Sequence, residues 1–76
     1  MIIRIKKQNR KEVMEFMADP ENIDYWVDSE LHHLVIEICG KEYIAKRGKE
    51  ETLEKGLDMI HEAVKNHYGF VDLSTL

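Results

Sequence analysis

Residues 31–46, LHHLVIEICGKEYIAK, predict a β-hairpin, and the rest of the fold can be worked out from it. Residues 31–38 are rich in aliphatic and β-branched side chains and predict the strongest strand of the chain. Cys39-Gly40-Lys41 predicts a tight turn, because Gly40 can adopt the positive φ that hairpin turns need. Residues 42–46 then return as the partner strand.

The register of this hairpin depends on which residues form its loop. If Gly40-Lys41 is a two-residue loop, Ile38 faces Tyr43 across the ladder. In the same register, Ile36 faces Ala45.

A helix is predicted over residues 50–67, EETLEKGLDMIHEAVKNH, because its apolar residues recur at helical spacing. Gly56 lies in the middle of this helix, where Gly costs about 1 kcal/mol relative to Ala, and this predicts a strand that approaches closely. Gly69 is expected to end the helix. The apolar stripe consists of Leu53, Leu57, Ile60 and Val64, with Met59 and Ala63 beside it.

Four shorter segments complete the predicted fold. Residues 2–6 and 23–28 predict strands, and residues 70–73 a short edge strand. Residues 10–18 predict a short helix, with a capping box at Asn9-Arg10-Lys11-Glu12 and Pro20 after its end. A strand is the rival interpretation of residues 10–18, because apolar residues also alternate there.

The expected fold is therefore α+β and a single domain over residues 1–76. A three- or four-stranded antiparallel sheet packs on one long C-terminal helix, in the order β-α-β-β-β-α-(β). No apolar run is long enough to span a membrane. Cys39 is the single cysteine, which favours a reducing, cytoplasmic setting.

Charge is strongly segregated along the chain, although the net charge is only −4. Residues 1–11 carry five basic residues and no acid, whereas residues 12–30 carry seven acids and no Lys or Arg. A general binder of nucleic-acid phosphates needs a net basic face, so direct nucleic-acid binding is not expected. A one-signed acidic patch instead attracts a protein with a basic surface.

Within residues 12–30, we expect the acids to face such a partner and one aromatic residue to anchor the contact. Strand alternation places Tyr25 and Trp26 on opposite faces, so one belongs to the core. The alternative interpretation is an acidic loop that only keeps a small protein in solution. The expected partner-binding residues are Asp19, Glu21, Asp24, Tyr25, Trp26, Asp28 and Glu30.

Catalysis is not expected, because so short a chain leaves little interior volume for a pocket and no motif links Cys39 to a histidine. No cofactor is required. A zinc-stabilised module remains an alternative, although no pair of candidate ligands has a recognised metal-ligand spacing. The candidates are His32, His33, Cys39, His61 and His67.

Two stretches, LVIEICGKEYIA at residues 34–45 and EETLEKGLDMI at residues 50–60, resemble small acidic α+β proteins of phages and prophages of Gram-positive bacteria. Several such proteins are anti-CRISPR proteins. The resemblance covers residues 31–60 and implies non-enzymatic inhibition of a nuclease such as Cas9 in a bacterial host cell. The basic N-terminus departs from a simple DNA mimic and leaves room for a mixed protein–protein interface.

A homodimeric assembly module is the first alternative to the inhibitor, ahead of the zinc-stabilised module, because chains this small often gain stability by association. Its pairing edge is expected at residues 23–28 or 70–73.

Overall fold

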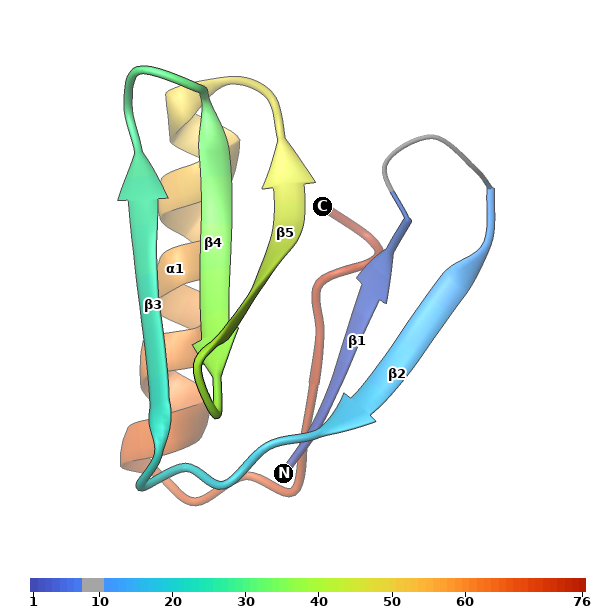
Figure 1. The fold of residues 1–76 in the computed structure, drawn as a ribbon, viewed down its shortest axis with the longest axis vertical. Helices are drawn as coiled ribbons and strands as arrows, with labels where there is room; N and C mark the ends of the chain where they lie inside the picture. The colour runs from blue at the N-terminus through green and yellow to red at the C-terminus, as the bar shows by residue number, and fades with distance from the viewer. Residues whose placement is uncertain (8–10) are drawn as a thin grey trace.

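The computed structural model describes residues 1–7 and 11–76, which form an α+β fold of two three-stranded sheets and one helix (Figure 1). The N-terminal sheet has the strand order β2-β1-β6, and the hairpin sheet has the order β3-β4-β5. The strands are β1 (Ile2–Lys6), β2 (Val13–Met17), β3 (Ile23–Asp28), β4 (His33–Ile38), β5 (Lys41–Arg47) and β6 (Phe70–Asp72), and the helix is α1 (Glu50–Lys65).

The expected helix over residues 10–18 is wrong for the part that the structure describes, because Val13–Met17 form strand β2. β2 pairs antiparallel with β1, so that Phe16 lies opposite Ile3 and Met14 opposite Ile5. Ile3 and Ile5 are buried, and alternate residues of β2 therefore cover apolar partners at the period of a strand. The rival strand interpretation is correct, while the cap expected at Asn9 lies outside the described residues.

The single antiparallel sheet and the order β-α-β-β-β-α-(β) are therefore also wrong. β6 does not extend the hairpin sheet but pairs with β1, and the pairing is parallel. A parallel pair needs a long connection between its two strands. Here α1 follows the hairpin sheet in sequence and returns the chain to the side of β1, where β6 begins.

The β4–β5 hairpin forms as predicted, but the predicted register is wrong. Its loop is Cys39-Gly40 rather than Gly40-Lys41, and both loop residues have positive φ, 52° and 80°. Ile38 therefore pairs with Lys41 and Ile36 with Tyr43. Positive φ at both central positions matches the twist of the flanking strands, which selects this loop.

α1 ends at Lys65, two residues before the expected end, and Gly69 does not cap it. His67 takes the left-handed conformation instead, with φ of 54°. The Tyr68 N–H donates to the Ala63 carbonyl at 2.9 Å, which is the closing hydrogen bond of a Schellman cap. Among the described residues, no helix is both long and apolar enough to cross a membrane.

One apolar cluster joins both sheets and α1. Gly56 is part of this packing, as expected, because a Cβ placed there would lie 2.6 Å from Leu34 Cδ2 and 2.8 Å from Leu76 Cδ1. The helix can approach β4 so closely only where it lacks a side chain. The largest fully buried side chains are Ile3, Leu34, Ile36, Leu53, Ile60 and Leu73.

Candidate functional site

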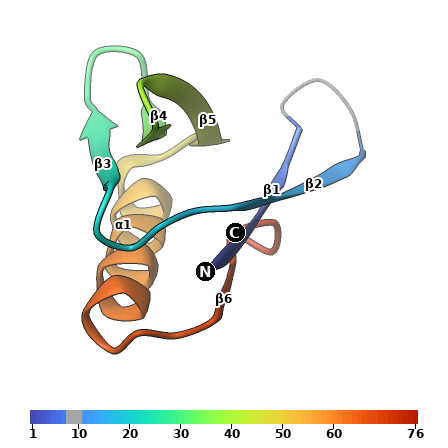
Figure 2. The ribbon, with the colours of Figure 1, turned by 60° about the horizontal axis from the view of Figure 1, so that its bottom comes forward.

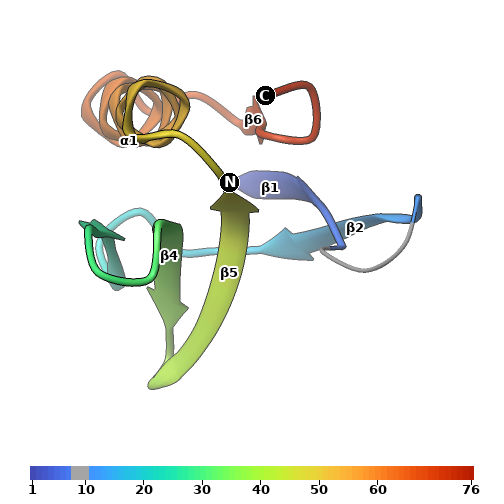
Figure 3. The same ribbon diagram turned by 90° about the horizontal axis from the view of Figure 1, so that it is seen from above.

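The candidate site is the face of the hairpin sheet that points away from α1. Figures 1 and 3 show α1 on one side of β3 and β4, and within the described residues no helix or strand lies over the other side. The hydroxyl of Tyr25 lies 3.0 Å from Nδ1 of His61 on the helix, so Tyr25 faces α1. Its neighbours Asp24 and Trp26 must therefore point to the opposite side, which we call the outer face.

Val35 on β4 supports this assignment. Only 6% of its surface is exposed, yet it lies outside the apolar cluster to which its neighbours Leu34 and Ile36 belong. Its burial comes from the outer face, where Trp26 is its cross-strand partner on β3 and Ile44 its partner on β5. We call Trp26, Val35 and Ile44 the apolar row.

An acidic row lies beside the apolar row. The two registers place Asp24 opposite Glu37, and Glu37 opposite Glu42, so that one carboxylate from each strand lies in line. Neighbouring strands are about 4.8 Å apart, and like charges directly opposite one another destabilise a sheet. Within the described part of the chain, none of the three carboxylates has an ion-pair or hydrogen-bond partner.

The nearest lysine of the hairpin does not neutralise this row. Lys41 Nζ lies 5.4 Å from the ring centroid of Tyr43, which stacks on Phe16 at 4.7 Å, between the two sheets. At its other end, the outer face carries a mixed row in which His33 lies opposite both Asp28 and Arg47. The outer face is therefore negatively charged near the β4–β5 loop, and it carries both acidic and basic side chains near the β3–β4 turn.

The structure does not bring the five acids predicted for partner binding into one patch. Asp19 and Glu21 precede β3, and Asp28 and Glu30 follow its centre, while a strand of six residues spans about 20 Å. Of these acids, only Asp24 belongs to the acidic row.

Two of the carboxylates predicted to bind a partner accept hydrogen bonds from backbone N–H groups. Asp19 Oδ1 accepts a hydrogen bond from the Glu21 N–H at 2.9 Å, and Asp28 Oδ1 accepts from the N–H groups of Glu30 and Leu31, both at 3.1 Å. These bonds shape the turns on either side of β3. Asp19 and Asp28 therefore have a local structural role, whereas Tyr25 packs against α1 and Trp26 lies on the outer face.

Sequence reasoning missed Glu37 and Glu42. Both alternate with residues that face the core, which is the signal that could have placed them on the outer face with Asp24. Their direct opposition follows from the Cys39-Gly40 loop, because the Gly40-Lys41 loop would have put Ile44 opposite Glu37.

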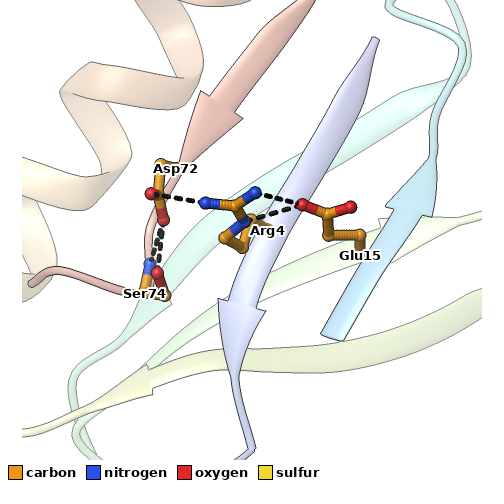
Figure 4. A network of polar contacts seen from close by, with 4 residues as sticks. All are labelled: Arg4, Glu15, Asp72 and Ser74. Carbon is orange, nitrogen blue, oxygen red and sulfur yellow. Dashed lines mark hydrogen bonds and ion pairs between the residues drawn. The ribbon is translucent and has the colours of Figure 1, made fainter. Parts of the chain in front are cut away.

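The basic N-terminus pairs with other acids than those of the outer face. Arg4 donates from Nε to Glu15 Oε2 at 2.7 Å and from Nη1 to Asp72 Oδ2 at 3.3 Å (Figure 4). Lys7 Nζ lies 3.4 Å from Glu12 Oε2. Glu12 and Glu15 of the acidic stretch are thus neutralised within the chain, while the five acids expected to bind a partner have no ion pair in the described residues.

The Arg4 network also holds an acid that sequence reasoning did not consider. Hydrogen bonds from the Ser74 hydroxyl and from the Ser74 N–H, together with the charge of Arg4, lower the pKa of Asp72 against the opposing effect of burial. A carboxylate whose pKa is lowered by folding stabilises the fold above its unfolded pKa. That stabilisation is lost as the pH falls through the folded pKa.

We therefore expect Asp72→Asn to be less stable than the wild type at pH 7, with a difference that shrinks as the pH falls below about 5. Urea denaturation at pH 7, 4 and 3 measures it. Asp58→Asn is the control, because Asp58 is exposed on α1 and has no hydrogen bond or ion pair in the described chain. A difference for Asp72→Asn that stays constant from pH 7 to pH 3 would contradict this assignment.

The structure does not bring three of the candidate zinc ligands together in the part of the chain that it describes. Cys39 is exposed in the hairpin loop, His33 lies on the outer face, and His67 follows the end of α1. In residues 1–7 and 11–76, no group of three or more His, Cys, Asp or Glu side chains is placed to hold a metal ion.

Comparison with known proteins adds no relative. No family model, curated protein or solved structure matches this chain.

Proposed function

We propose that this protein is a small, non-enzymatic binding protein that inhibits a nucleic-acid-handling protein with a basic surface, in the manner of an anti-CRISPR protein. The outer face of the hairpin sheet occupies the basic site of the partner. The observation that supports this proposal is the acidic row of Asp24, Glu37 and Glu42, which lies beside Trp26 and has no ion-pair or hydrogen-bond partner among residues 1–7 and 11–76.

The spacing of the acidic row suits a cleft that normally holds nucleic acid. Its three residues lie on neighbouring strands, whose backbones are about 4.8 Å apart. One strand of B-DNA carries a charge about every 3.4 Å along the helix axis, so the row reproduces part of a phosphate track. Lys and Arg side chains that bind phosphates also bind carboxylates.

The apolar row adds apolar contacts, which a row of phosphates cannot make. Trp26 lies beside the acids, is partly exposed and is outside the apolar cluster, so it adds apolar contact area without being needed to fill the interior. Val35 is buried beside it and supports its ring. Trp is among the residues most enriched at the energetic centres of protein interfaces. It also stacks favourably with Arg, which is common on nucleic-acid-binding surfaces.

The test compares two variants with the same change in charge. Asp24→Asn, Glu37→Gln and Glu42→Gln together remove the acidic row, and Glu54→Gln, Asp58→Asn and Glu62→Gln remove three exposed acids of α1. The probe is a set of purified Cas9–guide RNA complexes from Gram-positive bacteria, and both binding and DNA cleavage are measured at two salt concentrations.

We expect the acidic-row variant to bind at least tenfold more weakly, chiefly through a slower association whose salt dependence is reduced. The same variant is expected to be more stable by about 0.2–1 kcal/mol for each like-charge pair removed. The α1 variant should bind like the wild type. Equal binding by the two variants, or the absence of inhibition of every complex in the set, would overturn the proposal for this class of partner.

A further inference from the structure

The two sheets have four edge strands, and three of them are protected against pairing with another chain. β6 is only three residues long and packs beside α1. β3 carries Asp24 and Asp28, and β5 is interrupted by a bulge opposite Leu34 and Val35. Short length, charges and bulges are the usual protections of a sheet edge, and they cover the two edges that the sequence had suggested for a dimer.

The fourth edge, β2, is a regular five-residue strand, and its one charged residue, Glu15, is neutralised by Arg4. Figures 1 and 2 show β2 at the border of the molecule, on the side away from β3 and α1. Val13 is 53% exposed and Met17 is 70% exposed, although both are apolar residues in a regular strand. Glu15 lies between them and is held by Arg4.

The backbone of β2 is also open at this edge. The Lys7 N–H donates to the Glu12 carbonyl at 2.9 Å, and the Ala18 N–H donates to the Met1 carbonyl at 2.8 Å. In an antiparallel ladder such bonds alternate, so even-numbered residues of β2 direct their N–H and C=O groups toward β1. Val13, Glu15 and Met17 direct theirs away from β1, where no strand of the described residues lies.

We propose that β2 pairs antiparallel with β2 of a second copy of this chain, about a two-fold axis at Glu15. In this register Val13 lies opposite Met17 of the partner subunit, and Lys11 lies opposite Asp19 of the partner subunit. These residues are all odd-numbered, so their opposed pairs are hydrogen-bonded pairs, and Met14 lies opposite Phe16 of the partner subunit as the non-hydrogen-bonded pair between them. The pairing joins the two N-terminal sheets into one continuous sheet.

Self-complementarity favours a second copy over an unrelated strand. The register matches an apolar residue with an apolar residue and a lysine with an aspartate. A slip of two residues in either direction would place Val13 or Met17 opposite Glu15. The two Glu15 carboxylates meet at the axis, but each is already bound to its own Arg4, which offsets their repulsion.

The dimer leaves the outer face of the hairpin sheet free, because β2 and β3 belong to different sheets on different sides of the molecule (Figure 2). Self-association and partner binding therefore rest on separate residues. Failure of one experiment does not decide the other.

Sedimentation equilibrium of the whole chain over a range of micromolar to millimolar concentrations tests the proposal. We expect a monomer–dimer equilibrium that Met17→Lys weakens at least tenfold, because an edge lysine opposes strand pairing. Leu31→Lys is the matched control, since Leu31 is 62% exposed in the β3–β4 turn and should leave association unchanged. A monomer at all concentrations, or equal effects of the two lysines, would overturn the proposal.

A cross-link tests the register independently of any loss of folding in the lysine variant. Cα atoms of a hydrogen-bonded antiparallel pair lie about 5.5 Å apart, which suits a disulfide. In a Cys39→Ser background, Glu15→Cys should form a covalent dimer under mild oxidation, whereas Lys55→Cys on α1 should not. Equal cross-linking of the two variants would contradict the two-fold axis at Glu15.

Discussion

Leu34→Ala is expected to lower the free energy of unfolding by about 2–5 kcal/mol. Leu34 is fully buried on β4 and belongs to the cluster that joins both sheets to α1. Its truncation leaves a cavity where the helix lies closest to the sheet, and a helix and a strand held by their neighbours cannot close it fully. Urea denaturation monitored by circular dichroism measures the loss.

The residue at position 34 also affects the cost of a second substitution, Gly56→Ala. In the wild type, Gly56→Ala should destabilise the protein, because the new Cβ would lie 2.6 Å from Leu34 Cδ2 in a packed interior. In the Leu34→Ala background this atom is absent, and Ala is favoured over Gly in a helix by about 1 kcal/mol. Gly56→Ala should therefore cost less in the Leu34→Ala variant than in the wild type, because only the contact of the new Cβ with Leu76 Cδ1 at 2.8 Å remains.

A double-mutant cycle measures this coupling directly. Leu53→Ala is a suitable reference background, because Leu53 is also fully buried on α1 but is not among the atoms nearest to Gly56. Gly56→Ala should remain destabilising there. The same cost for Gly56→Ala in all three backgrounds would show that contact with Leu34 does not explain the glycine.

Trp26→Ala is expected to produce the largest loss of partner binding from a single substitution, about 2 kcal/mol or roughly thirtyfold in Kd. Trp26 lies in the centre of the outer face, between the acidic row and the mixed row. Because it is outside the apolar cluster, the truncation should change the melting temperature far less than Leu34→Ala. Binding to the Cas9–guide RNA complexes that the wild type inhibits measures the effect.

Tyr68→Ala is the control for loss of an exposed aromatic side chain, since Tyr68 is 49% exposed beyond the end of α1. Trp26 is the single tryptophan of the chain, so a protein labelled with 5-fluorotryptophan gives one fluorine resonance for the outer face. That resonance should shift or broaden when the partner is added. An unchanged resonance in the presence of a bound partner would exclude the outer face from the contact.

Local sequence was sufficient for the elements whose periodicity is long or whose flanking residues are distinctive. The strands over residues 2–6 and 23–28, the β4–β5 hairpin and the amphipathic helix all form where they were expected, with end residues that differ slightly. Gly56 was also interpreted correctly as a point of close approach. These features depend on contacts between near neighbours in the chain, or on the absence of one side chain.

Local sequence was not sufficient to assign the short segment around β2. Five residues of alternating apolar character fit one turn of helix almost as well as a strand, and only pairing with Ile3 and Ile5 on β1 makes the strand the better solution. The hairpin loop is a similar case. A one-residue difference in the loop changed which residues of β4 and β5 face each other, although it left each residue on its expected side.

The amino-acid sequence by itself determined the α+β class, the helix, the central hairpin and the presence of an acidic segment with two aromatic residues. Only the tertiary structure separated the acids into turn-forming, ion-paired and unpaired groups, and it placed Asp24 in line with Glu37 and Glu42. It also joined Arg4 to Asp72, 68 positions later in the chain. Which charges lie side by side depends on the pairing of strands far apart in sequence, and no local pattern of residues specifies that pairing.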